Sequence, residues 1–175
     1  VKKIESVIKR VLNFSKPNKY KLKSTDINVP VKEVVLLSHP ALKKTNIAVE
    51  LDLAEGLPHI YIDAQLIEQA LLNLINNAME AMEGVDFKRI RVASSREEDQ
   101  LVLRISDTGK GIPPENIDKI FSPFFTTRSN GSGLGLSICQ RIITDHDGTV
   151  DVFSSPRGGS EFIIRLPLEK RAIKR

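Results

Sequence analysis

The segment of residues 64–82 constrains the fold most, because its apolar and polar side chains separate onto opposite faces at helical spacing. With about 100° of turn per residue, the polar side chains fall within one narrow arc. The apolar set is Ile67, Leu71, Leu74, Ile75, Ala78 and Met82, and the polar arc is Gln69, Asn73, Asn77 and Glu80. Asp63 precedes the run and is a suitable N-cap. The pattern predicts a long helix with one face in a core.

The polar arc contains two asparagines one helical turn apart, Asn73 and Asn77. Asparagine is a poor helix former, so this pair costs stability compared with glutamate or lysine. An amide oxygen is a neutral hard ligand, which suits Mg²⁺ and the phosphate and water around it. The pair indicates a binding face, although an ordinary solvated helix face would show the same amphipathic pattern.

The remaining segments predict an α/β sandwich. Alternating apolar residues predict strands at 47–53 and 60–62, and two hairpins, 89–95 with 101–106 and 149–154 with 160–166. Helical spacing predicts helices at 3–14, 31–44 and 137–145, and a short strand is expected at 26–29. Pro40 is expected to kink or end the second of these helices early. We therefore expect two layers, with one face of the sheet covered by helices.

Charge and composition exclude several classes of protein. The net charge of +4 is concentrated at the ends, since residues 1–23 carry +7, residues 169–175 carry +3, and the body carries −6. A DNA-binding domain usually places its positive charge on the folded face, so no nucleic-acid partner is expected. A single cysteine, Cys139, excludes an intramolecular disulfide and a zinc site with two thiolates. No apolar stretch is long enough for a bilayer, so we expect this chain to be cytoplasmic without membrane contact of its own, and a membrane anchor elsewhere in its parent protein stays open.

A glycine-rich turn follows the strand predicted at 101–106. Its residues are Asp107, Thr108, Gly109, Lys110, Gly111, Ile112 and Pro113. Glycines let a backbone turn sharply and approach a flat ligand, and the Asp107 carboxylate can accept a hydrogen bond from an amine such as that of adenine. Taken alone, this pattern is most often an ordinary turn.

A second glycine-rich run, Gly131 to Leu136, directly precedes the helix predicted at 137–145. Backbone amides at a helix N-terminus form an anion site, although the run is neither a Walker loop nor a dinucleotide fingerprint. Three phenylalanines lie just before it, at 121, 124 and 125, followed by Thr126, Thr127 and Arg128. They indicate either a lid that packs down on a ligand or an ordinary hydrophobic anchor for a long loop.

Taken in series, NLINNAMEAM, DTGKGIP, FSPFFTT and GSGLGLSI resemble the catalytic domain of sensor histidine kinases, of the GHKL superfamily, in particular the nitrogen-regulation type. The resemblance covers roughly residues 25–167 and implies the Bergerat ATP-binding fold, a mixed, mostly antiparallel sheet preceded by a short N-terminal helix. It divides the chain into a remnant of the dimerisation and phosphoacceptor helix (1–17), a linker (18–24), an ATP-binding domain (25–168) and a basic tail (169–175).

The resemblance also implies roles for individual residues. Asn77 would ligate Mg²⁺, Asn73 would assist at the metal or phosphates, and Asp107 would bind the adenine amine. Arg128 is a candidate cation for the γ-phosphate. The other nucleotide contacts it implies are Gly109, Gly111, Ile112, Phe124, Thr126, Thr127, Gly131, Ser132, Gly133, Leu134, Gly135 and Leu136.

The implied activity is transfer of the γ-phosphate of ATP to a histidine on a separate dimerisation domain, with a response regulator downstream. None of His39, His59 and His146 has the sequence context of that acceptor, so it is expected outside this chain. We expect this chain to be a monomer and its parent a homodimer. The alternatives are an ATPase like the gyrase, mismatch-repair and chaperone enzymes, a serine-directed anti-sigma kinase, and a binding module without activity. An ATPase would need a carboxylate base where this chain has Asn73.

Overall fold

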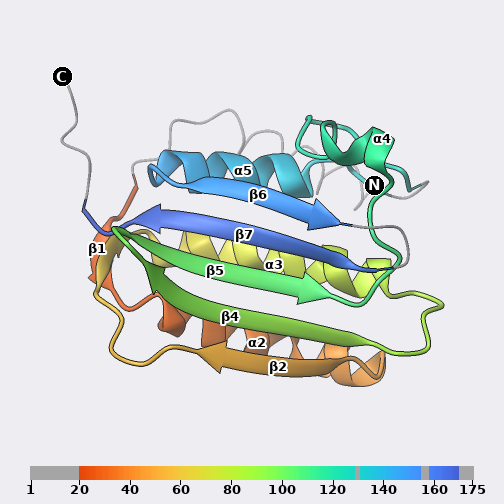
Figure 1. Cartoon of the computed structure of the whole chain (residues 1–175), viewed down its shortest axis with the longest axis horizontal. Helices are drawn as coiled ribbons and strands as arrows, with labels where there is room; N and C mark the ends of the chain where they lie inside the picture. The colour runs from red at the N-terminus through yellow and green to blue at the C-terminus, as the bar shows by residue number, and fades with distance from the viewer. Residues whose placement is uncertain (1–19, 129–130, 155–157, 170–175) are drawn as a thin grey trace, which may run out of the picture.

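A computed structural model describes residues 20–128, 131–154 and 158–169 of the chain. The helix expected at 3–14, the expected domain remnant 1–17 and nearly all of the tail lie outside these residues. The described residues form two layers, a sheet and a set of helices behind it (Figure 1). The expected α/β sandwich is therefore confirmed.

The main sheet has five strands in the order β2-β4-β5-β7-β6. They are β2 (Ala48–Leu53), β4 (Arg89–Glu97), β5 (Gln100–Asp107), β7 (Ser160–Pro167) and β6 (Thr149–Ser154). Only β2 and β4 are parallel, and every other pair is antiparallel, as expected for a mixed sheet. Both predicted hairpins, β4 with β5 and β6 with β7, are confirmed. The register places Asp107 opposite Ser160, where β5 ends and β7 begins. The candidate site begins at this end of the two strands.

Three helices cover one face of the sheet: α2 (Asn28–Lys44), α3 (Ala64–Ala81) and α5 (Gly135–Asp145). The central helix α3 packs against both neighbours and against β5. Its predicted apolar face is buried throughout, and the side chains of Ile67, Leu71, Leu74, Ile75, Ala78 and Met82 are each at most 4% exposed. Among the described helices, none has the length and hydrophobicity that crossing a bilayer requires.

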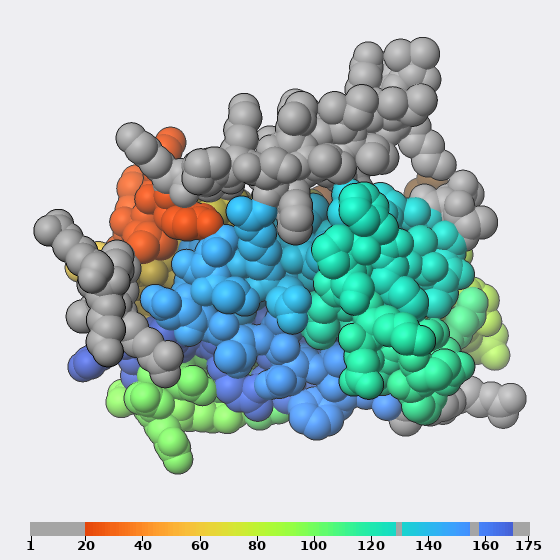
Figure 2. All heavy atoms as spheres, turned by 90° about the horizontal axis from the view of Figure 1, so that it is seen from above, coloured from red at the N-terminus to blue at the C-terminus, as the bar shows by residue number. Residues whose placement is uncertain are grey.

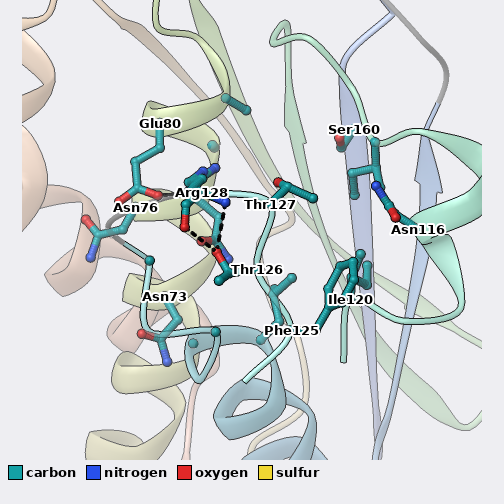
Figure 3. Close-up of a pocket in the computed structure, with 18 of the residues that line it drawn as sticks. Asn73, Asn76, Glu80, Asn116, Ile120, Phe125, Thr126, Thr127, Arg128 and Ser160 are labelled. Carbon is teal, nitrogen blue, oxygen red and sulfur yellow. Dashed lines mark hydrogen bonds and ion pairs between the residues drawn. The ribbon is translucent and has the colours of Figure 1, made fainter. Parts of the chain in front are cut away.

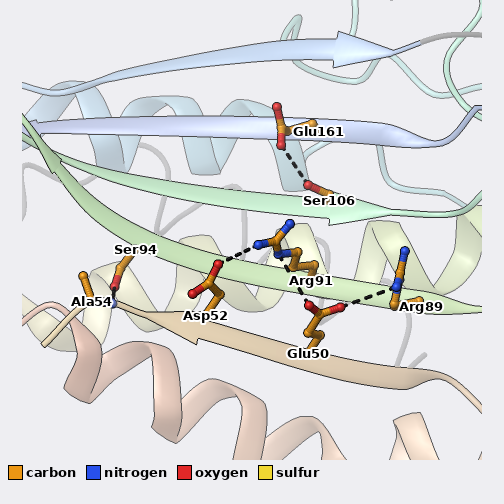
Figure 4. A network of polar contacts seen from close by, with 8 residues as sticks. All are labelled: Glu50, Asp52, Ala54, Arg89, Arg91, Ser94, Ser106 and Glu161. Carbon is orange, nitrogen blue, oxygen red and sulfur yellow. Dashed lines mark hydrogen bonds and ion pairs between the residues drawn. The ribbon is translucent and has the colours of Figure 1, made fainter.

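The face of the sheet opposite the helices carries ion pairs between neighbouring strands (Figure 4). Arg91 of β4 contacts Asp52 of β2 at 2.6 Å, and Glu50 of β2 accepts contacts from Arg89 and Arg91 at 3.5 and 3.8 Å. Each pair is well exposed and contributes little stability on its own, on the order of 1 kcal/mol or less. The charges keep this face hydrated and discourage edge pairing at β2.

A second, two-stranded sheet joins β1 (Lys23–Thr25) to β3 (Ile60–Ile62). Asp63, directly after β3, ties it to the helices. Its Oδ1 accepts from the Leu66 N–H at 3.4 Å as the N-cap of α3, and its Oδ2 accepts from the Lys21 N–H at 2.9 Å. Its own N–H donates to His146 Nε2 at 3.0 Å, at the end of α5. The predicted cap is confirmed, and Asp63 also connects the start of the chain to both α3 and α5.

The strand expected at 26–29 is wrong, because α2 already begins at Asn28. Asp26 starts the helix: its Oδ1 accepts from the Asn28 N–H at 2.9 Å and its carbonyl accepts from the Val29 N–H at 3.1 Å. Pro30 is tolerated in the first turn, where backbone N–H groups have no helical partner. The strand of this region lies earlier, so the last two residues of the expected linker belong to β1.

Of the kink or early helix end expected at Pro40, the early end is wrong, since α2 continues to Lys44. Pro40 removes the N–H that would bond to the carbonyl of Leu36. Both residues are exposed, with Leu36 68% exposed, so water can hydrate that carbonyl. The helix is held by its opposite side, where Val31, Val34 and Leu42 are buried.

Replacing Asp63 with alanine removes the N-cap of α3 and the acceptor for the Lys21 N–H. We expect a loss of about 1–2 kcal/mol in the free energy of unfolding, measured by urea denaturation. Asp86→Ala is the control, because Asp86 is an exposed aspartate of a loop. Equal stability of the two variants would contradict the connecting role of Asp63.

Candidate functional site

A cavity of about 530 Å³ lies beside α3, where Asp107 ends β5. Its walls are α3, the end of β5 with the turn after it, the start of β7, the short helix α4 (Pro114–Ile117) and the N-terminus of α5. A further wall comes from residues 118–128 and 131–134, which lie between the two last helices and are here named the α4–α5 segment. Figure 2 shows this blue-green part of the chain as a block at one end of the molecule, opposite the orange β1.

The cavity brings together 13 of the 16 residues predicted from the sequence. They are Asn73, Asn77, Asp107, Gly111, Ile112, Thr126, Thr127, Arg128, Gly131, Ser132, Gly133, Gly135 and Leu136. Gly109, Phe124 and Leu134 do not line it. Residues that are far apart in the sequence therefore meet at one place.

The α3 wall presents the amides of Asn73 and Asn77. Both Nδ2 atoms are buried and have no hydrogen-bond partner within the described residues, where only Ser38 Oγ is in the same condition. Buried polar atoms in proteins are nearly always paired, because an unpaired one costs about 1–3 kcal/mol. Two such atoms one turn apart on a cavity wall indicate a surface built to contact a polar ligand.

Asp107 lines the cavity at the end of β5, near the C-terminal end of α3, and is only 8% exposed. Its Oδ1 accepts from the Gly109 N–H at 2.7 Å, and the backbone N–H of Ser160 also donates to the carboxylate. Burial raises the pKa of Asp107 above its ordinary value, and the two backbone hydrogen bonds oppose that rise. The sheet therefore holds a poorly solvated carboxylate at the cavity wall, where it can accept a hydrogen bond.

Gly109 holds the turn after Asp107 against the end of α3. A Cβ on Gly109 would lie 2.8 Å from both the Cβ and the carbonyl oxygen of Ala81, and that carbonyl accepts from the Lys110 N–H at 3.1 Å. Gly109 thus allows close packing and does not contact the cavity. It fixes the distance between Asp107 and the asparagines of α3.

The turn between β6 and β7 also positions Asp107, which the sequence did not reveal. Gly159 has φ +78°, and a Cβ there would lie 1.9 Å from the Asp107 carbonyl oxygen. Ser154 Oγ donates to the Gly159 carbonyl at 2.8 Å and accepts from the Ile112 N–H at 2.7 Å. This hairpin therefore holds both ends of the glycine-rich turn.

The N-terminus of α5 faces the cavity through Gly131, Ser132, Gly133 and Gly135. The N-cap residue Leu134 is 2% exposed and packs inward, which is why it does not line the cavity. No side chain caps α5, so its first backbone N–H groups are left for another acceptor. A helix N-terminus of this kind attracts anions.

The phenylalanines of the α4–α5 segment differ in position. Phe125 lines the cavity, and Phe121 packs edge to face on Phe162 with ring centroids 6.5 Å apart. Phe124 is 66% exposed at φ +67°, and its N–H donates to the Gly133 carbonyl at 2.9 Å. The segment is thus anchored by two inward rings, and the backbone of Phe124 joins its middle to Gly133 near its C-terminal end.

Arg128 reaches from this segment to α3, where it forms an ion pair with Glu80. Figure 3 shows Arg128 between Glu80 and Thr126, beside the wall that carries Asn73. Burial lowers the pKa of Arg128 below its ordinary value. The one predicted cation is therefore at the asparagine end of the cavity.

Sequence reasoning missed several lining residues: Asn76, Ala78, Glu80, Ala81, Pro113, Asn116, Ile120, Phe125, Ser160 and Phe162. Glu80 belonged to the polar arc and Phe125 to the phenylalanine run, so both had a signal. Ser160 and Phe162 had none, because only the pairing of β5 with β7 brings them next to Asp107 and Ile105.

Residues 62–170 match the family described as "Histidine kinase-, DNA gyrase B-, and HSP90-like ATPase". The signal transduction histidine-protein kinase AtoS of Escherichia coli is 36% identical over 166 residues, which are 94% of this chain and 27% of AtoS. The chain spans about a quarter to a third of the length of the curated relatives that it matches.

Solved structures agree with this match. The catalytic domain of histidine kinase ThkA has a TM-score of 0.76 at 33% identity, covering 85% of this chain and 96% of that one. ThkA in complex with the response regulator protein TrrA gives 0.82 at 31%, covering 97% and 49%. Full-length ShkA in complex with AMPPNP gives 0.84 at 26%, covering 97% and 36%.

Replacing Gly133 with alanine should deform the α4–α5 segment, because a Cβ there would lie 2.4 to 2.7 Å from the Phe124 backbone at a φ of +66°. We expect the affinity for AMPPNP, measured by calorimetry, to fall roughly tenfold or more, given a steric cost of about 1–3 kcal/mol. Gly84→Ala is the matched control, since Gly84 also has positive φ but open space around it. Unchanged affinity in Gly133→Ala would contradict the importance of this contact.

Proposed function

Because the chain belongs to the family of histidine kinase-, DNA gyrase B- and HSP90-like ATPases, we propose that it binds MgATP and transfers the γ-phosphate to a histidine of a separate dimerisation domain. That domain would belong to the same two-component sensor kinase, with a response regulator downstream. The observation that carries the proposal is the pair of buried amide nitrogens without partners, Asn73 Nδ2 and Asn77 Nδ2, on residues of the cavity wall. AtoS and ThkA are named as histidine kinases, and the ThkA structure includes a response regulator.

The metal site fits the residues present. The side-chain oxygens of Asn73 and Asn77 are of the kind that Mg²⁺ accepts. Their unpaired Nδ2 atoms are donors, which suit phosphate oxygens beside the metal. We propose Asn77 as the ligand and Asn73 as the residue that assists at the metal or phosphates. When bound, Mg²⁺ would neutralise phosphate charge and orient the triphosphate.

The adenine would lie at the Asp107 end of the cavity. The carboxylate is fixed by Gly109 and Ser160 and is shielded from water, so a hydrogen bond to it is stronger than one on the surface. Ile112, Ile120 and Phe162 line the same cavity and offer apolar surface to a flat ring. The exocyclic amine of adenine supplies the donor that the Asp107 carboxylate needs.

The phosphates would lie toward α3 and the N-terminus of α5. Gly133 and Gly135 line the cavity beside the uncapped N-terminus of α5, and Arg128 supplies the positive side chain. Transfer of a phosphoryl group depends mainly on positioning and on stabilising charge spread over its oxygens. The chain therefore holds the nucleotide and its charge, while the acceptor supplies the nucleophile.

The histidines of this chain do not serve as acceptors in this proposal. His146 is 7% exposed, its Nε2 accepts from the Asp63 N–H, and its Nδ1 lies 2.7 Å from the Ile142 carbonyl oxygen. His39 and His59 are exposed, and none of the three lines the cavity. The acceptor is expected on the partner domain.

The test is calorimetry of MgATP binding to this chain, followed by labelled ATP with a separately supplied phosphoacceptor domain of the parent kinase. Binding together with acid-labile labelling of that domain supports the kinase. Binding with steady phosphate release and no labelling would favour an ATPase instead, and absence of binding would leave only the fold.

Replacing Asn77 with alanine should abolish phosphoryl transfer without lowering the free energy of unfolding. We expect loss of Mg²⁺-dependent transfer, measured by labelling, because the proposed metal ligand is gone. The free energy of unfolding should stay equal or rise by up to about 0.7 kcal/mol, since alanine is a better helix former and an unpaired buried amide is removed. Gln69→Ala, on the same arc but away from the cavity, is the control. Normal transfer by the Asn77 variant would overturn the metal assignment.

The raised pKa of Asp107 makes ATP affinity sensitive to acid. Only the ionised carboxylate accepts from the adenine amine in full, so affinity should fall as pH falls through that pKa, starting at higher pH than for an exposed aspartate. Asp107→Asn should bind roughly tenfold to a hundredfold more weakly at neutral pH. The ATP affinities of the wild type and of Asp107→Asn are measured by calorimetry at several pH values. The ratio of the wild-type affinity to that of the variant should decrease as the pH is lowered. A constant ratio would contradict this role of the carboxylate.

A further inference from the structure

Charge in the described part of the cavity is carried by three side chains. Arg128 is the basic one, and Asp107 and Glu80 are the acidic ones. Asp107 is held by two backbone N–H groups, and Glu80 is the anion that pairs with Arg128. A carboxylate beside the expected path of a triphosphate would repel it. The presence of Glu80 there therefore points to another role for this side chain.

We propose that Glu80 is a positioning residue that holds the Arg128 guanidinium at the phosphate end of the cavity through their ion pair. This inference rests on the proposed function, because it assigns Glu80 a task in that transfer. Glu80 lies one turn beyond Asn77 on the same helix, so it fixes Arg128 relative to the asparagines that would hold the metal.

The backbone around Arg128 supports this arrangement. Thr126 Oγ1 accepts from the Arg128 N–H at 3.1 Å, and the Gly131 N–H donates to the Arg128 carbonyl at 3.3 Å. A Cβ on Gly131 would lie 2.4 Å from Thr126 Oγ1, so Gly131 approaches Thr126 closely. The base of the Arg128 side chain is thus fixed by its own segment, and Glu80 fixes the end (Figure 3).

The pair is suited to sharing Arg128 with a ligand. The two side chains are 41% and 49% exposed, and such a pair changes an equilibrium by roughly fivefold at most. A guanidinium has five N–H donors, so it can keep one edge on Glu80 while another faces phosphate. Without Glu80, the long Arg128 side chain would sample many rotamers and meet the phosphates less often.

Holding of Arg128 can be tested without any kinase activity. Trypsin cleaves after arginine, and an arginine held in an ion pair is cleaved more slowly than a free one. We expect Glu80→Gln to be cleaved after Arg128 several times faster than the wild type, as followed by mass spectrometry. Glu83→Gln is the control, because it removes the same charge from an exposed residue that does not line the cavity. Equal cleavage rates in all three chains overturn the proposal.

The consequence for transfer is tested by a double-mutant cycle with labelled ATP and the phosphoacceptor domain. We expect Glu80→Gln to lower kcat roughly fivefold with KM for ATP nearly unchanged, and Arg128→Gln to lower kcat further. Because Glu80 acts through Arg128, adding Glu80→Gln to Arg128→Gln should cause no further loss. Glu83→Gln should behave as the wild type.

An additive loss in the double variant, or a loss that excess Mg²⁺ reverses, would overturn the proposal and make Glu80 a direct contact of the metal or nucleotide. Absence of labelling with the wild type would refute the proposed function instead. In that case the trypsin rates still decide whether Glu80 holds Arg128, so the two failures are distinguishable.

Discussion

The two-sided packing of α3 is the constraint on which the rest of the structure depends. Its apolar face is fully buried against the sheet and the neighbouring helices, which fixes the rotation of the helix about its axis. That rotation aims Asn73 and Asn77 at the cavity. The two ends of the helix are fixed as well, by Asp63 at the start and by the contact of Ala81 with Lys110 at the end.

The site is built from groups that cost stability. Asp107 is a buried carboxylate with a raised pKa, and the amide nitrogens of Asn73 and Asn77 on α3 lack partners. Each of these would be removed by selection for stability alone. Their gathering around one cavity is what a ligand site requires, because a ligand can supply the missing partners. The remainder of the fold, with its apolar core and paired surface charges, compensates for these costs.

Much of the fold was predictable because it depends on local periodicity. The long helix, its cap and both hairpins followed from apolar spacing and turn residues, and Asn73, Asn77 and Asp107 were found from their residue types at those places. The strand expected at 26–29 failed because Asp26 bonds to the backbone two and three residues on and starts a helix. Gly159 and Ser160 were missed as site residues because their proximity to Asp107 exists only after β5 pairs with β7.

The sequence by itself determined most of the helices and strands and their apolar faces, since those depend on contacts within a few residues. It also carried the order of the four motifs from which the family was identified. Only the tertiary structure decided which side chains meet: that Phe125 and not Phe124 faces the cavity, that Gly109 packs on α3, and that Arg128 pairs with Glu80. The reason is physical. Contacts between distant segments depend on strand register and helix rotation, which the packing of the whole core sets.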